Sequence, residues 1–432
     1  MLEKIQNIFR IPELRSRILF TLGILAVCRL GTYVPMPGVN AKALADAADV
    51  GGVFAFWDLF AGGAIRRGAI FSLGIMPHIT SSIIFSLLVT VVPALERIQK
   101  EGESGRQKIT QYTRYLTVVI CLLQSIPMSR QVVSAGLIMN PGFGFTMTAI
   151  TALTAGGVLL MWLGEQISER GIGNGISLLI FVNIISRMPA TFMQVIESLK
   201  IGTMDPLKVI VLLVLMFVVV GAIVMLTQAQ RRIPIQYPRQ VRGRRSYGGA
   251  RSYLPLRVLH AGVIPIIFAS SMLMLPRMLS GLIDNVALNN FIDTWFTTRH
   301  WFYNLCYTGL IIFFAYFYTA IVFNPIQIAD DLKKYGGFIP GIRPGRPTAS
   351  YLDFVMTRIT LAGAIALALV AMTPLVVSSV FNVDYGISRF FGGTSLLIVV
   401  GVALDTVRQI ETHLLMRQYD GFMSRGRIRG RR

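Results

Sequence analysis

Apolar stretches of about 20 residues recur along this whole chain, and each is long enough to cross a lipid bilayer. Ten can be read from the sequence: 18–36, 69–92, 115–136, 145–164, 174–193, 207–228, 261–283, 303–323, 358–380 and 392–412. A helix satisfies its own backbone hydrogen bonds, which no other open structure does in lipid. We therefore expect an all-α polytopic membrane protein with ten transmembrane helices.

The charged residues are few, and they lie in particular connections. Only 14% of the 432 residues are charged and 53% are hydrophobic, whereas soluble domains contain about 25% charged residues. A large soluble enzyme is excluded, because so many apolar side chains need lipid around them. Most Lys and Arg residues fall in the N-terminal segment, in the connections 94–114, 165–173, 229–260 and 324–357, and in the tail 413–432. The positive-inside rule places these segments, including both termini, in the cytoplasm.

The connection 197–206 separates five predicted spans from five others. This gives an N-terminal half, 1–196, and a C-terminal half, 197–432. Because five is odd, the second half starts on the opposite side of the membrane. Two related halves would then form an inverted repeat, although no internal identity is visible in the sequence.

Two cytoplasmic connections are unusually long. The first, 229–260, carries eight arginines and no acidic residue, and the second, 324–357, has Pro and Gly at several turn positions. Ordinary connections run to about 4–6 residues, and much longer ones usually serve a function or are disordered. The residues alone leave both alternatives open.

The segment 53–67 is apolar but too short to span, and it contains a Gly-Gly pair at 62–63. It fits a re-entrant piece, which is tolerated where it is buried in protein or lines a cavity. It fits an interfacial helix on the outer surface equally well. The pattern of residues alone does not separate these alternatives.

Prolines and glycines mark two further places within the predicted spans. Pro77 and Pro265 are each flanked by isoleucine, one in each half. A proline inside a helix removes a hydrogen bond, so we predict a kink at each. Gly171, Gly173 and Gly175 lie between two spans, which predicts a tight turn and a close approach of the following helix.

Ionisable side chains are scarce near the middle of the predicted spans. Arg29, Glu165, Asp405 and Arg408 fall toward span ends, whereas carriers of ions and polar solutes usually keep charges at the midplane. The four histidines are scattered and the three cysteines lie in apolar stretches. No nucleophile–base pattern, metal cluster or ATP-binding loop is evident, so we expect neither an enzyme nor a cofactor.

Seven stretches, in the family's order from about residue 20 to 415, resemble the SecY family of protein-translocase channel subunits. They are IFSLGIMPHITSSII, KEGESGRQKITQYTRY, LMWLGEQISERGIGNGIS, AGVIPIIFASS, FFAYFYTAIVFNP, FIPGIRPGRPTASYLDFVMTRITL and FGGTSLLIVVGVALD. The resemblance implies two pseudo-symmetric halves of five spans around a central hourglass pore. It also implies a channel that translocates unfolded secretory polypeptides and releases membrane-protein segments laterally into lipid. The alternative is a secondary solute transporter with inverted repeats, which the apolar midplane disfavours.

The resemblance also assigns roles to residues of this chain. An aliphatic pore ring, which can exclude ions by dewetting, would comprise Ile75, Ile79, Ile176, Ile180, Ile267 and Ile398. The segment 53–67 would be a re-entrant plug, with Phe56, Trp57, Leu59, Phe60, Gly62 and Gly63. A lateral gate would include Pro77, Thr80, Ser86, Leu259 and Pro265. Leu259 and Ser86 depart from the polar amide that many bacterial relatives carry at these positions.

The two long cytoplasmic connections would be docking surfaces for a motor and for the ribosome. The matching residues are Arg242, Arg244, Arg245, Arg251, Arg343 and Arg346. The partners that the resemblance implies are the small membrane subunits SecE and SecG, the motor ATPase SecA, the ribosome with its rRNA, signal sequences, nascent polypeptides and membrane lipid. The expected location is the bacterial cytoplasmic (inner) membrane.

Overall fold

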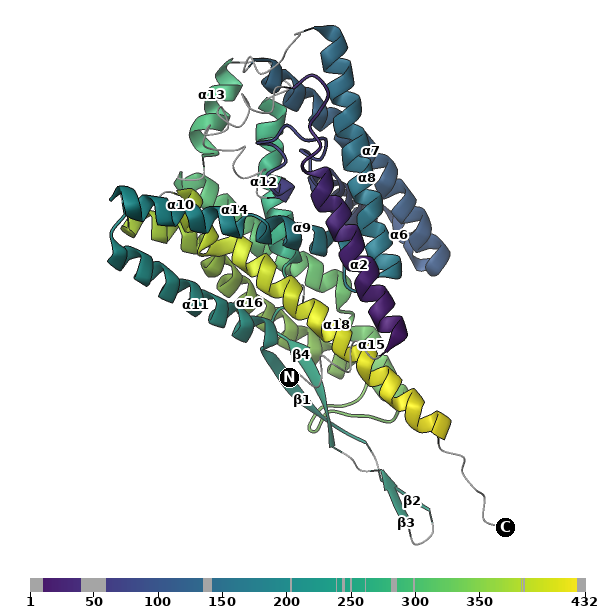
Figure 1. The fold of residues 1–432 in the computed structure, drawn as a ribbon. Coiled ribbons are helices and arrows are strands. Elements are labelled where there is room, and N and C mark those ends of the chain that lie inside the picture. The colour runs from purple at the N-terminus through teal and green to yellow at the C-terminus, as the bar shows by residue number, and fades with distance from the viewer. Residues whose placement is uncertain are drawn as a thin grey trace. The chain divides into compact units, whose positions relative to one another are not determined.

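A computed structural model describes residues 11–39, 60–134, 142–202, 204–237, 239–242, 245–248, 251–260, 262–280, 286–297, 300–381, 383 and 385–425 (Figure 1). Its helices are α2 (Pro12–Gly31), α5 (Met76–Val91), α6 (Pro93–Lys100), α7 (Glu103–Ser134), α8 (Phe143–Arg170), α9 (Gly175–Ile185), α10 (Met188–Ile201), α11 (Pro206–Gln228), α12 (Ile264–Ser280), α13 (Val286–Trp295), α14 (Trp301–Val322), α15 (Pro325–Lys334), α16 (Arg346–Phe381), α17 (Tyr385–Phe390) and α18 (Gly393–Arg425). The strands are β1 (Gln230–Gln236), β2 (Arg239–Arg242), β3 (Arg245–Gly248) and β4 (Arg251–Arg257).

The chain forms two compact units. Unit 1 comprises Met1–Glu197, Met274–Thr297 and Val402–Arg432, and unit 2 comprises Ser198–Leu273 and Thr298–Gly401. Within unit 1, α5 and α8 pack on α7, and α2 packs on α8 and α9. Within unit 2, α11, α14, α15 and α17 all pack on α16. The division into halves at 196 and 197 stays a prediction.

A helix lies over each of the ten predicted spans, which agrees with the all-α fold class. Six helical stretches in the described part of the chain are long and apolar enough to cross a membrane: Phe143–Arg170, Gly175–Ile201, Pro206–Gln228, Trp301–Lys334, Arg346–Phe381 and Gly393–Met416. A seventh is reached if α5 and α6 count as one span, although they bend by 99° at Val92. The number ten therefore stays a prediction.

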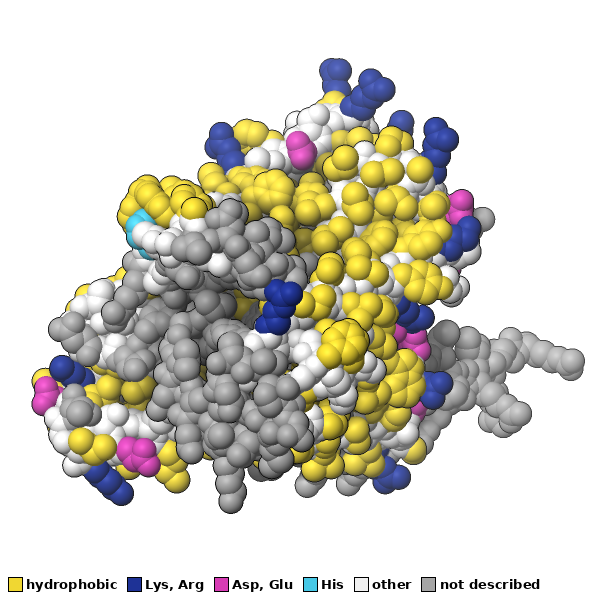
Figure 2. Space-filling model, turned by 90° about the horizontal axis from the view of Figure 1, so that it is seen from above, with side chains coloured by type: hydrophobic (Ala, Val, Ile, Leu, Met, Phe, Trp, Pro, Cys, Tyr) yellow, Lys and Arg dark blue, Asp and Glu magenta, His cyan; other side chains and the backbone are white. Residues whose placement is uncertain are grey.

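Side chains on these helices are apolar where they face outward. On α11, Leu207, Phe217 and Met225 are more than 70% exposed, which would be costly in water. Figure 2 shows hydrophobic side chains over a broad area of one face, with Lys and Arg mainly at its margins. This surface is the one that lipid is expected to cover.

Two sequence predictions about helix ends are wrong. The second span, predicted from residue 69, has turns up to Gly74, and α5 begins at Met76. Pro77 and Pro265 are the second residues of α5 and α12, so neither kinks a helix. Proline is tolerated in the first turn because its missing N–H would have no helical partner there. Prolines inside helices occur instead at Pro127, Pro276 and Pro374.

The predicted turn between α8 and α9 is confirmed. Gly173 has φ +91, and Asn174 caps α9 by accepting hydrogen bonds from the backbone N–H groups of Ile176 and Ser177. A Cβ at Gly175 would lie 1.9 Å from the carbonyl oxygen of Gly164 in α8. Only glycine allows the two helices to approach so closely.

The connection 229–260, expected to be a loop, contains two antiparallel strand pairs. β1 pairs with β4, and β2 with β3 (Figure 1). The pattern in β1 alternates, with Ile233 and Ile235 buried around the exposed Pro234. A small core fixes the first pair to unit 2, with Ile233, Leu256, Phe323, Ile339, Leu352, Val355 and Met356.

Candidate functional site

A buried segment, residues 60–75, precedes α5 and fills the interior of unit 1. Phe60, Ala64 and Ala69 have no exposed surface, and Ile75 is 1% exposed. Apart from the beginning, which is helical at Phe60 and Ala61, the segment runs in turns. It contains the described part of the predicted plug, since Phe56, Trp57 and Leu59 lie outside the described residues. Burial of 60–65 favours the re-entrant interpretation over a helix on the outer surface.

The end of the buried segment nearest α5 is fixed by the backbone and by close packing. The N–H of Ile70 donates to the carbonyl of Val34 at 3.0 Å, and the N–H of Met36 donates to the carbonyl of Gly68 at 2.7 Å. A Cβ at Gly31 of α2 would lie 2.0 Å from the ring of Phe71. At this end the segment is therefore fixed by its backbone hydrogen bonds to Val34 and Met36 and by the packing of the Phe71 ring against Gly31.

The other end of the segment is held by two side chains. The Nη1 atom of Arg29 in α2 donates to the carbonyl oxygen of Gly62 at 2.6 Å. The Nδ2 atom of Asn183 in α9 donates to the carbonyl oxygen of Phe60 at 2.7 Å. Sequence analysis placed Arg29 at a span end without a role and missed Asn183. The only signal for Asn183 was a single amide in an otherwise apolar helix.

The guanidinium of Arg29 also borders an aromatic ring. It lies 5.3 Å from the centroid of the Tyr33 ring, and the guanidinium of Arg67 lies 3.9 Å from it. Cation–π contacts of this kind add about 0.5–2 kcal/mol according to how far they are desolvated. They bring Arg29 of α2 and Arg67 of the segment to the same ring.

The six candidate ring isoleucines lie in both units. Ile75, Ile79, Ile176 and Ile180 belong to unit 1, and Ile267 and Ile398 belong to unit 2. Five are no more than 5% exposed, and Ile176 is partly buried. On α9, Ile176, Ile180 and Asn183 follow one another at spacings of four and three residues, so they share one helix face. The closure of a ring by all six residues stays a prediction.

The candidate gate residues are buried or bonded within their own helices. Thr80 donates to the carbonyl of Met76 at 3.0 Å, and Ser86 donates to that of Ser82 at 2.7 Å. Pro77 is buried in unit 1, and Leu259 and Pro265 are buried in unit 2. These two hydroxyls thus find acceptors in α5 itself. A gate formed by the five residues stays a prediction.

His260, next to Leu259, contacts the ring of Phe323 edge-on with centroids 5.6 Å apart. Burial and, secondarily, the charge of Arg257 lower the pKa of this imidazole. The side chain is therefore neutral at physiological pH. It adds no charge beside the end of β4, the strand that precedes it.

The candidate docking arginines lie on three pieces of unit 2. Arg242 and Arg245 are cross-strand partners at the end of the β2–β3 ladder. Arg251 begins β4, and Arg244 lies outside the described residues. Arg343 and Arg346 are exposed before and at the start of α16.

The two long connections, 229–260 and 324–357, are joined through their backbones. Gln236 of β1 and Phe338 exchange both backbone hydrogen bonds, at 2.9 and 3.0 Å. A Cβ at Gly337 would lie 3.0 Å from the ring of Tyr237. The connections that sequence analysis treated separately thus form one continuous structure.

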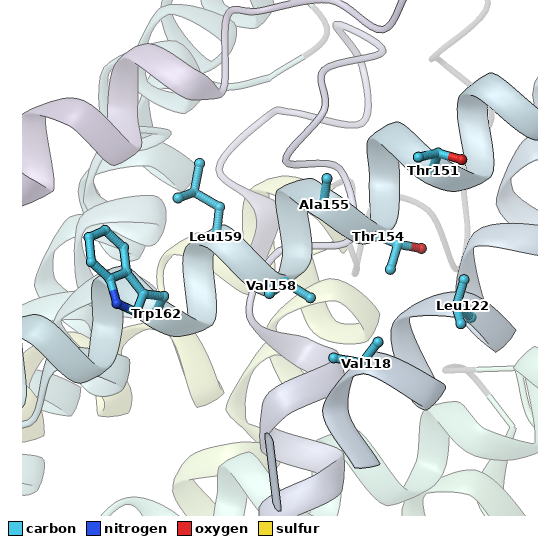
Figure 3. Close-up of a pocket in the computed structure, with 8 residues that line it drawn as sticks. All are labelled: Val118, Leu122, Thr151, Thr154, Ala155, Val158, Leu159 and Trp162. Carbon is cyan, nitrogen blue, oxygen red and sulfur yellow. The ribbon is translucent and has the colours of Figure 1, made fainter. Parts of the chain in front are cut away.

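An apolar groove of about 640 Å³ lies on α7 and α8 (Figure 3). Its lining consists of Val118, Leu122, Thr151, Thr154, Ala155, Val158, Leu159 and Trp162. It holds no titratable side chain, and Trp162 is 52% exposed. An apolar lining open to the outside is expected of a surface in contact with lipid, and the groove is not part of the site.

On the same two helices, the Nε atom of Arg114 in α7 donates to Glu165 in α8 at 2.9 Å. This bond raises the pKa of the Arg114 guanidinium. In the part of the chain that the structure describes, no group of three His, Cys, Asp or Glu residues could hold a metal.

Comparison with known proteins agrees with the sequence resemblance. The SecY family profile matches residues 69–407. The chain is 43% identical to protein translocase subunit SecY of Thermotoga maritima, over all of both chains. It is 45% identical to that of Streptomyces griseus, over 96% of this chain and 98% of the relative.

Three solved structures share the fold at low sequence identity. A protein-conducting channel has a TM-score of 0.66 at 18% identity, covering 92% of this chain and 91% of that one. A SecY protein whose plug domain stabilises the closed state and maintains a membrane seal has a TM-score of 0.65 at 17% identity, with the same coverage. Sec61 in a canine ribosome–channel complex has a TM-score of 0.64 at 18% identity, again covering 92% and 91%.

Proposed function

The chain belongs to the SecY family, and from this premise we propose how its residues close and open a protein-conducting channel. Full-length relatives at 43–45% identity are translocase subunits, so the chain is a protein-translocating channel subunit and not an enzyme. It is a multi-pass protein of the bacterial inner membrane. The solute-transporter alternative is set aside, because both the family and the fold are those of channel subunits.

The observation that carries the proposal is the buried segment 60–75, which ends at Ile75. It occupies the interior of unit 1 and leads directly into α5, which carries Ile79. A desolvated segment backed by aliphatic side chains leaves no path for a hydrated ion. We assign it to the closed state, as the described part of a plug that comprises 53–67. The six isoleucines form the constriction that remains when the plug moves aside.

Aliphatic side chains suit a channel whose passengers have no fixed sequence. Apolar walls fit around varied side chains without binding any of them tightly, whereas a charged ring would retain segments of opposite charge. Segments that are apolar enough leave for lipid between α5 and α12, at the gate residues Pro77, Thr80, Ser86, Leu259 and Pro265. Both termini and both long connections face the cytoplasm.

A cysteine at Ile79 tests the path. In a chain whose Cys28, Cys121 and Cys306 are replaced, Ile79→Cys should crosslink a secretory polypeptide that is stalled in mid-transit. A cysteine at Phe217, which is 71% exposed on α11, serves as the lipid-facing control and should give no product. Crosslinking from Phe217 but never from Ile79 would contradict the pore assignment.

The proposed partners follow from the cytoplasmic structure and from the family. SecE and SecG would be the small membrane subunits, and SecA or a translating ribosome would deliver signal sequences and nascent chains. The proposed docking surface carries six arginines: Arg242, Arg244, Arg245, Arg251, Arg343 and Arg346. The first four lie in 229–260, which contains no acidic residue. Such a surface favours acidic partners such as rRNA phosphates.

Replacing Arg244 and Arg245 together by glutamine should weaken ribosome binding and lower its salt dependence. Each lost phosphate contact reduces the slope of log affinity against log salt by about one. The measurement is co-sedimentation with ribosomes over a salt series. Replacing Arg97 and Lys100, a basic pair on α6, removes the same charge elsewhere and should leave the slope unchanged. Equal slopes for the two variants would reject docking at 244 and 245.

A further inference from the structure

We propose that Arg29 and Asn183 form a polar latch that holds the plug closed and sets how strong a signal must be to release it. The latch is the pair of hydrogen bonds to the carbonyls of Gly62 and Phe60. The inference rests on the proposed role of the buried segment as a channel seal. It goes further by naming the side chains that position that segment.

The geometry of the latch is specific. Two helices, α2 and α9, approach the same three-residue stretch from positions 33 and 123 residues away in the chain. Gly62 adopts φ +65, and a Cβ there would lie 2.7 Å from Oδ1 of Asn183 and 3.0 Å from Nη1 of Arg29. Glycine at this position therefore lets both donors reach the backbone.

The two ends of the buried segment are held by different kinds of interaction. Near α5, Phe71 packs against Gly31, and a Cβ at Gly156 of α8 would lie 2.2 Å from the carbonyl oxygen of Ile70. At the other end Phe60 and Ala64 are also fully buried, and the two side-chain hydrogen bonds add to this packing. Hydrogen bonds in a dry interior are strong, but water or a polypeptide backbone can replace them once the site is wetted. The two latch hydrogen bonds are therefore the contacts that water or a passenger can replace.

Glycines lie between the two ends, where the chain must bend. Gly62, Gly63 and Gly68 all have positive φ. Glycine occupies either sign of φ at similar cost, so these turns can change without moving Phe71. For the segment to swing from its fixed end, the hydrogen bond that the Ser72 hydroxyl donates to the carbonyl of Ala64 at 3.1 Å must break as well as the latch.

The chemistry of the two donors also matters. Arg29 brings a full charge, and charge-assisted hydrogen bonds are stronger than neutral ones. Asn183 lies on the same face of α9 as Ile176 and Ile180, three residues beyond Ile180. A passenger that spreads the isoleucines of α9 therefore also moves Asn183 away from Phe60. This couples arrival of a passenger to release of the plug.

The test uses the complete channel complex in lipid vesicles, with Arg29→Gln, Asn183→Leu and both together. Each single change should raise the resting ion flux about tenfold. Each should also permit translocation of a passenger whose signal sequence has been made less hydrophobic. Arg29→Lys keeps a charged donor and should restore part of the closure.

Two control variants match these changes. Arg17→Gln removes an exposed arginine of the same helix, whose partner is Glu13 at 3.5 Å. Ser186→Ala removes a hydroxyl of the turn after α9 that donates only to the backbone of Asn183. Neither should change the flux or the signal requirement. In a chain that lacks residues 56–65, the latch changes should add nothing, because the segment they hold is gone.

The outcomes separate the latch from the seal. If deletion of 56–65 raises the resting flux but Arg29→Gln and Asn183→Leu do not, the latch is wrong and the channel assignment stands. If the deletion itself leaves the flux unchanged, the proposed seal fails. If the latch changes raise the flux equally with and without 56–65, they act on folding or packing elsewhere, and the latch is overturned.

Discussion

Deletion of residues 56–65 is expected to convert a sealed channel into one that leaks ions at rest. When the open state lies a few kcal/mol above the closed state in free energy, it is populated at about 0.1–10%. Removing the segment that closes the channel makes that state predominant, so the resting flux should rise between about tenfold and a thousandfold. The measurement is ion efflux from vesicles that contain the purified complex, without passenger or motor.

The comparison must separate loss of the seal from loss of chain length. Removing ten residues from the tail, 423–432, shortens the chain equally and should leave the vesicles tight. The aliphatic side chains remain after deletion of 56–65, so translocation should persist. Tight vesicles after that deletion would instead favour the surface-helix interpretation of 53–67.

A second large effect is expected at the contact between α8 and α9. Gly175→Val would place a branched side chain where a Cβ alone lies 1.9 Å from a backbone oxygen of Gly164 and 2.8 Å from the Cβ of Ile167. Neither the carbonyl nor the β-carbon can move without displacing α8. We expect a loss of about 4 kcal/mol or more, which is exceptional for a single substitution.

Thermal unfolding of the purified complex, together with its yield in membranes, measures this effect. Gly221→Val provides the matched control, because Gly221 also lies inside a helix, α11, and a Cβ there meets nothing within 4 Å. The control should unfold near the temperature of the unmodified protein. Similar midpoints for the two variants would show that α8 and α9 do not need glycine at their contact.

The positions of the helices could be predicted because a helix that crosses lipid requires a long apolar run, whatever other helices pack against it. The 23-residue α11 illustrates this, since it coincides with the span predicted at 207–228 to within one residue. The close approach at Gly175 was predictable for a related reason, since three glycines in five residues between two spans have few other uses. In each case the information is local in the sequence.

Contacts between distant side chains and backbone carbonyls could not be predicted. Arg29 and Asn183 bind the carbonyls of Gly62 and Phe60. Every residue has a backbone carbonyl, so residue types do not show which carbonyl will accept a hydrogen bond. The ends of α5 and α12 depended on turns buried against neighbouring helices, so Pro77 and Pro265 were placed inside helices by mistake. The strand pairs were missed because the core that supports β1 includes Phe323 and Leu352, about 90 to 120 positions further along the chain.

The backbone exchange between Gln236 and Phe338 has a mechanical consequence. Through it, and through Ile233 and Leu256 packed on Leu352, the strand pair is attached to the 36-residue helix α16. A load applied to β1 and β4 is then passed to α16 at Leu352, through the core that they share. A partner that docks on this surface, as proposed above, therefore also acts on α11 and α14, which pack on α16.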